Sequence, residues 1–210
     1  MGVKCAWEGR LVSAVGTRRP QPHQLFYVER QVLQLPDFDC APGLILDIGG
    51  GGEGVIGRLK GRQVVSIDTI ERELAGVCND SLKIVMDARR MQFLPGSFAT
   101  VTAFFSLMYM AAEDQMAVLQ EAHRVLRPGG DFLLWDTAMP VPPDLEQAHL
   151  MLPLTVCLPD GQTIRTGYGA PLKPQGPAYF GDLAVHAGFA LVECRAGEYL
   201  LHLRLRRTTG

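Results

Sequence analysis

Short apolar runs, each ending in an acid, dominate the first half of the sequence. Three of them end at Asp47, Asp68 and Asp87, and a fourth, more strongly apolar run covers residues 98–109. Runs of this length between turn residues predict buried strands of an α/β sheet. Because open parallel sheets bind ligands at the carboxyl ends of their strands, the three acids predict a binding site along that edge.

Helical and alternating patterns in the second half predict the rest of the sheet. The chain reverses at Gly129 and Gly130 after Pro128, which cannot continue a helix. Leucines alternate with polar residues from Leu201 to Arg206, as expected for a strand with one buried face. The expected elements are helix 116–126, a fifth strand ending at Asp136, helix 179–187 before Gly188, and an antiparallel strand pair at 190–195 and 199–206.

The segment before the first strand predicts a helix. Residues 24–35 place apolar side chains at helical intervals, and Pro36 would end the helix. A helix in this place could close over a ligand, so His23 and Tyr27 become candidates for substrate contact. We expect one domain over residues 1–210, whose N-terminal helical segment covers residues 1–40.

The segment after the fifth strand, residues 137–177, predicts a substrate cover. It is rich in proline and has no long helical period. Within it, residues 154–158 and 162–166 flank a Pro-Asp-Gly turn, which predicts a β-hairpin. Residues 167–169 read as a flexible loop, and Tyr168 in that loop is a further candidate for substrate contact.

A glycine cluster follows the first acid. Gly49, Gly51 and Gly54 match G-x-G-x-x-G, a pattern that lets a ligand approach the main chain closely but is weak alone. Asp47 would face the phosphates of a dinucleotide unfavourably. S-adenosylmethionine carries an ammonium and a sulfonium instead, so the acid favours a methyl donor over NAD. A plain turn capped by Asp47 is the simpler alternative.

The other strand ends complete a nucleoside site. Asp68 lies about 20 residues after the first glycine, the spacing expected for a carboxylate that accepts hydrogen bonds from ribose hydroxyls. Asp87 could accept from the adenine amine, and Phe105 and Ser106 could flank the adenine or the methionine. Alternatively, Asp68 is a solvated strand end and the aromatic residues are ordinary core.

Four segments in this order resemble the seven-stranded class I S-adenosylmethionine-dependent methyltransferases, particularly their small-molecule and quinone-type members. The segments are L-I-L-D-I-G-G-G-G-E-G (44–54), V-V-S-I-D (64–68), V-M-D-A (85–88) and V-L-R-P-G-G-D-F-L-L-W-D (125–136). The resemblance covers residues 40–136 well. It implies a three-layer α/β/α sandwich with a mostly parallel seven-stranded sheet and an antiparallel last strand.

The resemblance also implies which residues hold the cofactor. We expect S-adenosyl-L-methionine to contact Asp47, Gly49, Gly50, Gly51, Asp68, Thr69, Asp87, Ala88, Phe105 and Ser106. The family's commonest loop is D-x-G-x-G-x-G, whereas here Gly54 comes one residue later, so we expect a wider loop. Glu53 then lies near a helix start, where the helix dipole favours a carboxylate.

Methyl transfer needs a nucleophile held close to the donor methyl group and shielded from water. Tyr109, just past the fourth strand, is our first candidate for a catalytic group and for acceptor contact. His23, Asp136, Tyr168 and Tyr179 are further candidates, although each is more often structural when considered alone.

Composition narrows the partners. The 210 residues carry a formal net charge of −2, and basic residues occur only in short clusters, so we do not expect a nucleic-acid substrate. The five cysteines are scattered and odd in number, and the histidines lack ligand spacing. These features predict reduced thiols, a cytoplasmic location and no metal site.

No segment has the length of a membrane span, and Met1 to Arg10 lacks the apolar stretch of a signal peptide. The cover's apolar and aromatic content favours a small-molecule acceptor, and no feature of the sequence predicts an oligomeric state. Two other functions stay open: an NAD-type oxidoreductase, and a module that binds S-adenosylmethionine without catalysis.

Overall fold

The computed structural model describes residues 21–39, 42–139 and 148–208, which fall into two compact units. The small unit contains residues 1–37 and 139–174, and the large unit contains residues 38–138 and 175–210. The two units are described separately below.

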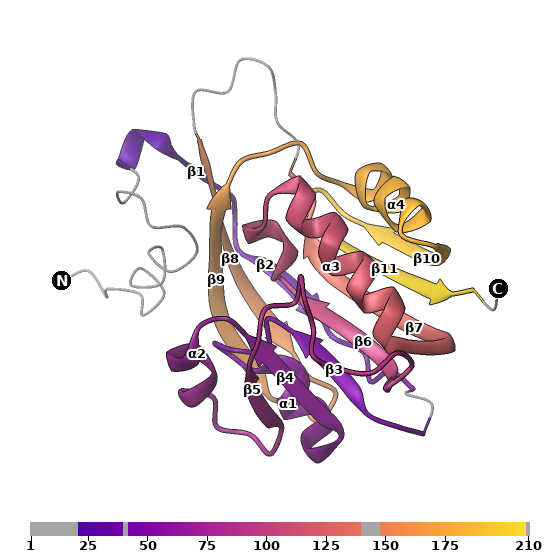
Figure 1. The fold of residues 1–210 in the computed structure, drawn as a ribbon. Coiled ribbons are helices and arrows are strands. Elements are labelled where there is room, and N and C mark those ends of the chain that lie inside the picture. Colours follow the sequence, from indigo (N-terminus) through magenta and orange to yellow (C-terminus); the bar gives the residue numbers. More distant parts are fainter. Residues whose placement is uncertain (1–20, 40–41, 140–147, 209–210) are drawn as a thin grey trace. The chain divides into compact units, whose positions relative to one another are not determined.

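The large unit is built on a seven-stranded sheet with the order β10-β11-β7-β6-β3-β4-β5 (Figure 1). β3 pairs in parallel with β4 and β6, which in turn pair in parallel with β5 and β7. β11 is antiparallel to both of its neighbours. The strands are β3 (Ile45–Ile48), β4 (Val64–Asp68), β5 (Leu82–Val85), β6 (Phe98–Phe104), β7 (Leu126–Thr137), β10 (Phe189–Ala196) and β11 (Leu200–Arg207). The predicted mostly parallel sheet with an antiparallel last strand is confirmed.

Helices cover both faces of this sheet, as the three-layer prediction requires. Figure 1 shows α3 and α4 side by side over one face, and α1 and α2 pack against β4 and its neighbours. The helices are α1 (Val55–Lys60), α2 (Glu71–Ala75), α3 (Ala112–Val125) and α4 (Pro177–His186). Two short 3-10 helices, η2 (Gly61–Gln63) and η3 (Leu107–Tyr109), complete the unit.

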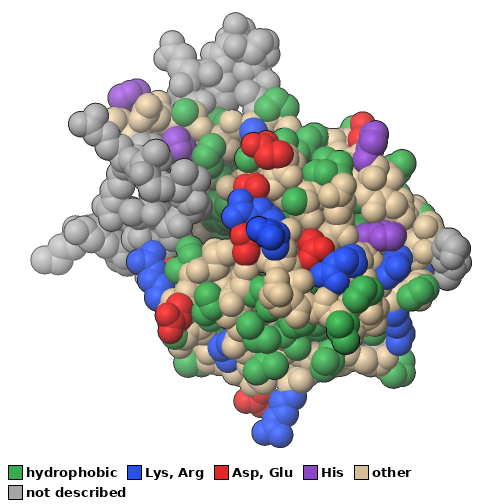
Figure 2. All heavy atoms as spheres, in the orientation of Figure 1, with side chains coloured by type: hydrophobic (Ala, Val, Ile, Leu, Met, Phe, Trp, Pro, Cys, Tyr) green, Lys and Arg blue, Asp and Glu red, His purple; other side chains and the backbone are tan. Residues whose placement is uncertain are grey.

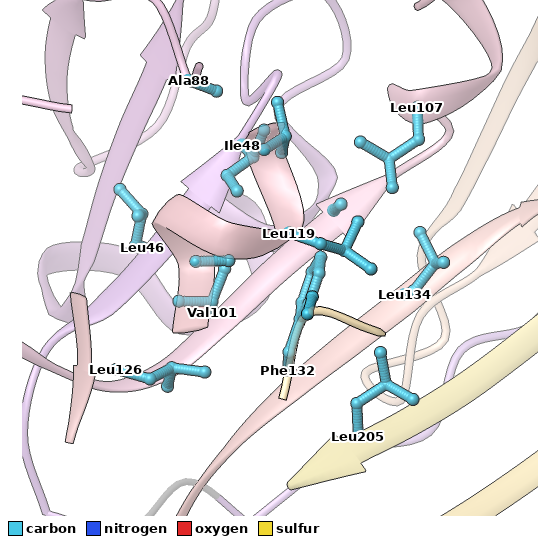
Figure 3. Packing of buried hydrophobic residues seen from close by; sticks show 14 of the residues in the cluster. Leu46, Ile48, Ala88, Val101, Leu107, Leu119, Leu126, Phe132, Leu134 and Leu205 are labelled. Atoms are coloured by element: carbon cyan, nitrogen blue, oxygen red, sulfur yellow. The ribbon is translucent and has the colours of Figure 1, made fainter. Parts of the chain in front are cut away.

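The main core lies between the sheet and helices α3 and α4. Leu46, Val101 and Phe132 point into it from β3, β6 and β7, and Leu119 of α3 meets them there (Figure 3). All four side chains are almost fully buried. Since side chains alternate along a strand, Asp47 points to the other face, away from this core.

Register brings the predicted acids to one edge of the sheet. Asp47 pairs with Ser66 on one side and Thr102 on the other, and Asp68 pairs with Val85. Because these strands are parallel, their carboxyl ends lie along the same edge. The segments that follow them therefore start close together in space.

The small unit is a four-stranded sheet. β8 (His149–Cys157) pairs in parallel with β1 (Leu25–Tyr27) and β2 (Gln31–Gln34), and antiparallel with β9 (Thr163–Pro171). A short 3-10 helix, η1 (Pro22–Gln24), precedes β1. The β8–β9 hairpin was predicted, and its turn is fixed by a hydrogen bond of 2.9 Å from the Gln162 amide to the Asp160 carboxylate.

Two predictions in this unit are wrong. The helix expected over residues 24–35 is instead β1 and β2, because both pair with β8, more than 110 residues later in the sequence. These strands are too short to show a clear alternation, so periodicity alone favoured a helix. The loop expected at 167–169 lies within β9, where pairing with β8 keeps it extended.

The remaining organisational predictions are not decided by these elements. Residues 1–20 of the expected N-terminal segment, and 140–147 of the expected cover, lie outside the described residues. The single-domain organisation over 1–210 stays a prediction. Within the described ranges, no helix combines the length and apolar character that crossing a membrane requires.

Candidate functional site

Asp47 lies at the centre of the predicted edge and is almost completely buried. Its carboxylate accepts a hydrogen bond of 2.7 Å from the Thr102 hydroxyl on the adjacent strand β6. Burial disfavours the charged form and raises the pKa of Asp47 to about 7, while the Thr102 hydrogen bond opposes this shift and the nearby Asp68 adds to it. A cation placed beside Asp47 would favour its ionised form.

The glycine loop lies directly against the carboxylates of Asp47 and Asp68. A β-carbon at Gly50 would lie 2.6 Å from an Asp47 carboxylate oxygen, and one at Gly51 would lie 2.8 Å from an Asp68 carboxylate oxygen. Real β-carbons do not approach other atoms so closely, so larger residues here would displace the acids. The amides of Gly49 and Gly50 donate to the Ile67 carbonyl across 2.9 and 3.1 Å, which ties the loop to the end of β4.

Asp68 is held by the backbone around it. One carboxylate oxygen accepts a 2.9 Å hydrogen bond from the Ile70 amide. Burial raises the pKa of Asp68, backbone hydrogen bonds from Ile70, Gly51 and Thr69 lower it, and the nearby Glu73 raises it. The carboxylate thus faces the glycine loop from the next strand, as the ribose role requires.

Asp87 is paired with Arg89, a contact that the sequence pattern did not predict. Both of its carboxylate oxygens accept hydrogen bonds from the Arg89 guanidinium, at 2.7 to 3.0 Å, and this contact lowers the pKa of Asp87. Arg89 also bridges to Asp114 on α3 across 3.0 Å. The loop after β5 starts beside Asp68, since the Met86 amide donates to the Asp68 carbonyl across 2.9 Å. The ion pairs of Arg89 connect this loop to α3.

Phe105 and Ser106 lie where β6 ends. Phe105 has a φ of 49°, the left-handed conformation that only glycine adopts easily, and is the one non-glycine residue with positive φ in the described ranges. The Ser106 hydroxyl donates to the Ile48 carbonyl across 2.9 Å. A β-carbon at Gly49 would meet the Ser106 side chain at 2.5 Å. Strain of this kind commonly occurs at functional sites, where surrounding structure maintains it.

A buried network of polar side chains lies beside this edge. Asp136, at the end of β7, accepts hydrogen bonds from the Met108 and Thr137 amides at 3.1 and 2.7 Å, and from the Gln175 side chain at 3.3 Å. Gln175 also donates to the Thr137 carbonyl across 2.9 Å. The side-chain amide nitrogen of Gln115 donates to the side-chain oxygen of Gln175 across 3.4 Å. Asp136 was among the residues predicted from the sequence, whereas the two glutamines carry no sequence signal that predicts this role.

This network fixes η3, the 3-10 turn that contains Tyr109. Gln115 donates to the Leu107 carbonyl across 2.7 Å, and Asp136 accepts from the Met108 amide. The Tyr179 hydroxyl donates to Gln115 across 2.5 Å. Buried hydrogen bonds to Leu107 and Met108 therefore hold the turn that ends at Tyr109.

The structure brings together most of the predicted cofactor residues. Asp47, Asp68 and Ser106 each lie against the loop of Gly49 to Gly51, since β-carbons at Gly50, Gly51 and Gly49 would meet them in turn. Thr69 is exposed and Ala88 is buried, each directly after the acid that ends its strand region. Their roles in cofactor binding stay predictions.

The predicted substrate residues are divided between the units. Tyr109 belongs to the large unit, whereas His23, Tyr27 and Tyr168 belong to the small unit. His23 and Tyr27 are exposed, and Tyr168 is buried in β9. No cluster of three His, Cys, Asp or Glu side chains suited to a metal ion occurs among the residues that the structure describes.

Comparison with known proteins agrees with this geometry. The family model of the methyltransferase domain matches residues 46–134, which contain the glycine loop and all or most of the five parallel strands β3 to β7. No curated protein matches the sequence.

Solved structures with a similar fold are numerous. An S-adenosylmethionine-dependent methyltransferase from Methanosarcina mazei has a TM-score of 0.61 and 16% identity, with 79% of this chain and 92% of that chain covered. The 1,6-didemethyltoxoflavin-N1-methyltransferase of Burkholderia thailandensis, solved with its substrate and S-adenosylhomocysteine, has a TM-score of 0.52 and 17% identity, with 80% and 72% covered. A cyclase also matches, with a TM-score of 0.56 and 16% identity, and 80% and 76% covered. At these identities the likeness shows the fold.

Residues 46–134 are similar to the methyltransferase domain, and the large unit has the seven-stranded, Rossmann-like fold that is found in solved S-adenosylmethionine-dependent methyltransferases.

Proposed function

We propose that the protein binds S-adenosylmethionine along the carboxyl edge of β3, β4 and β5 and transfers its methyl group to a small-molecule acceptor. The observation that carries the cofactor assignment is the pair of carboxylates, Asp47 and Asp68, that face glycines too close to accept a β-carbon. Carboxylates in this position suit a cationic amino acid moiety and ribose hydroxyls, and they disfavour a pyrophosphate.

Each part of the cofactor has a candidate partner in the large unit. Asp47 would attract the ammonium group, directly or through water, and Asp68 would accept from the ribose hydroxyls. Asp87 and Ala88 would face the adenine, with Phe105 and Ser106 beside it. When bound, S-adenosylmethionine supplies a methyl group already activated by its sulfonium.

The protein's own task is then to position the acceptor and exclude water. Tyr109 is our candidate for the group that contacts the acceptor, because the buried network fixes the turn that carries it. We propose that His23, Tyr27 and Tyr168 of the small unit provide further acceptor contacts. A general base is required only for an acceptor that arrives protonated.

Charge and composition favour a small acceptor over a nucleic acid. The net charge is −2, and the face in Figure 2 shows basic and acidic side chains interspersed, without a continuous basic field. The B. thailandensis methyltransferase, of similar fold, was solved with 1,6-didemethyltoxoflavin bound. The three described cysteines, Cys78, Cys157 and Cys194, are free thiols, which supports the proposed cytoplasmic location.

Calorimetric titration with S-adenosylmethionine, S-adenosylhomocysteine and NAD tests the cofactor assignment. We expect saturable binding of the first two, and Asp68→Ala should weaken it by about 1–3 kcal/mol through loss of the ribose hydrogen bonds. Asp182→Ala on α4 is the matched control and should bind like the natural protein. Binding of NAD in preference to S-adenosylmethionine would overturn the proposal in favour of an oxidoreductase.

Transfer is tested separately from binding. The protein is incubated with S-adenosylmethionine and a panel of phenols, amines and thiols, and release of S-adenosylhomocysteine is measured. An accepted substrate separates an enzyme from a module that only binds the cofactor. With that substrate, Tyr109→Phe should lower kcat while the cofactor affinity stays unchanged.

A further inference from the structure

The end of the glycine loop is held by a side chain from another part of the unit. Asn79, in the connection between α2 and β5, donates a hydrogen bond of 3.0 Å from its side-chain amide to the Gly54 carbonyl. Gly54 is the residue at which the loop enters α1, and its carbonyl also accepts the first backbone hydrogen bond of the helix, from Arg58 at 2.9 Å. Asn79 therefore contacts the loop at its junction with the helix.

The orientation of the Asn79 amide is fixed by its other partners. Its oxygen accepts from the Ser81 amide at 3.1 Å and from the Ser81 hydroxyl at 2.7 Å. Because a backbone amide can only donate, the oxygen must face Ser81 and the nitrogen must face Gly54. Ser81 in turn accepts from the Ser66 hydroxyl on β4 at 3.0 Å, so the contact is anchored in the buried sheet.

The glycines of the loop make room for this side chain. A β-carbon at Gly57 or at Gly54 would overlap the Asn79 amide. Four consecutive glycines, Gly49 to Gly52, give the loop more conformational freedom than other residues would, and ordering them is costly. A restraint at the far end of the loop orders part of it in advance, so less conformational entropy is lost when the cofactor binds.

We infer that Asn79 is a positioning residue of the cofactor site, which holds the wider glycine loop in the shape that places Gly50 against Asp47 and Gly51 against Asp68. This inference rests on the proposed cofactor. Asn79 acts through the loop: its amide fixes Gly54, the Gly54 amide donates to the Gly51 carbonyl across 3.3 Å, and Gly51 lies against Asp68. The glycine loop, which is one residue longer than the family's commonest loop, is thereby kept in a single conformation.

The decisive variant is Asn79→Asp, which has nearly the same shape and keeps both hydrogen bonds from Ser81. It replaces the donor that faces Gly54 with a carboxylate oxygen, which the Gly54 carbonyl repels. We expect the affinity for S-adenosylmethionine, measured by calorimetry, to fall roughly tenfold, as the loss of one buried hydrogen bond implies. The added negative charge would by itself attract the cationic cofactor, so a loss of affinity cannot come from charge.

Ser81→Ala weakens the same contact less, because it removes the hydroxyl but leaves the Ser81 amide to orient Asn79. It should lower the cofactor affinity by less than Asn79→Asp does. Gly57→Ala is a second route to the effect of Asn79→Asp, since its methyl group would push the Asn79 side chain from Gly54. Hydrogen exchange of the Gly51 to Gly54 amides should accelerate most in Asn79→Asp and Gly57→Ala. Asp182→Ala on α4 is the control and should keep the natural affinity and exchange rates.

Two results would overturn the inference alone: natural affinity in Asn79→Asp despite a lower melting temperature, or a loss of affinity in Asn79→Asp without faster exchange of the Gly51 to Gly54 amides. Either would show that Asn79 does not position the cofactor site through the loop. Failure of the natural protein to bind S-adenosylmethionine is a different outcome, which overturns the proposed cofactor and this inference with it.

Discussion

Thr102 donates a hydrogen bond to the buried carboxyl group of Asp47 across 2.7 Å, from the strand next to it. One hydroxyl does not compensate for the loss of water around a fully buried charge, so burial remains the larger effect and the pKa of Asp47 stands near 7. The group at the centre of the candidate site therefore changes its charge within the physiological range of pH.

Stability should fall as the pH rises from about 4 to about 7. An unfolded Asp ionises near its ordinary pKa of 3.8, whereas Asp47 in the folded protein retains its proton until about pH 7. The unfolded state thus binds fewer protons in this interval, and the contribution of Asp47 to the free energy of unfolding decreases by up to about 4 kcal/mol. Urea unfolding at pH 5 and pH 8 measures about two thirds of this change. Asp47→Asn should remove it, and the same pH slope in that variant would contradict the assignment.

Cofactor binding should release protons near neutral pH. Pairing with an ammonium group favours the ionised form of Asp47, so S-adenosylmethionine should bind more tightly at pH 8 than at pH 6. Calorimetry in two buffers of different ionisation enthalpy counts the protons released. We expect a substantial fraction of one proton at pH 6.5 in the natural protein and a much smaller release in Asp47→Asn. Equal release in both proteins would place the titrating group elsewhere.

Alanine at Gly50 should disturb the site directly. Its β-carbon would lie 2.6 to 2.8 Å from Asp47 and Ser66, so these side chains must move, at a cost of about 1–3 kcal/mol in stability. We also expect at least a tenfold loss of affinity for S-adenosylmethionine, measured by calorimetry. Gly181→Ala is the control: Gly181 lies inside α4 with nothing within 4 Å of the added carbon. That variant should be more stable by about 1 kcal/mol, with unchanged binding.

Removal of the Gln175 side chain should loosen the turn that carries Tyr109. Gln175→Ala leaves the Thr137 carbonyl and one contact of Asp136 without their donor, and should lower the free energy of unfolding by about 1–3 kcal/mol. Tyr179→Phe removes one hydrogen bond at the less buried end of the network and should cost about 1 kcal/mol. Chemical unfolding measures both. Equal stability of Gln175→Ala and the natural protein would show that the network does not hold the turn.

The positions of Asp47 and Asp68 could be predicted because their determinants are local in sequence. Asp47 and Asp68 directly end the strands that position them, and the glycines follow Asp47 without interruption. Strand, acid and turn can be recognised together within a few residues. The parallel register then brings the acids to one edge without any further information.

Residues that act through distant contacts could not be predicted in this way. Gln115 and Gln175 are 60 positions apart and meet only after the sheet has formed. Asn79 reaches back 25 positions to Gly54. An uncharged polar residue has no pattern that distinguishes a buried hydrogen bond from ordinary exposure. The helix predicted over residues 24–35 was wrong for a similar reason, since pairing with β8 determines the conformation of β1 and β2.

The hydrogen bond between the Thr137 carbonyl and the Gln175 side chain has a consequence for how such a protein diversifies. These residues mark the points where the chain leaves the seven-stranded sheet and rejoins it, and they lie in contact at 2.9 Å. The two ends of the intervening segment are therefore held next to each other in the large unit, as at sites that tolerate inserted domains. Recombination could replace residues 139–174, together with the strands β1 and β2 that pair with them, while the sheet and its glycine loop stay intact. Chimeras that exchange residues 1–37 and 139–174 together would test the acceptor contacts proposed for the small unit, because the large unit stays constant.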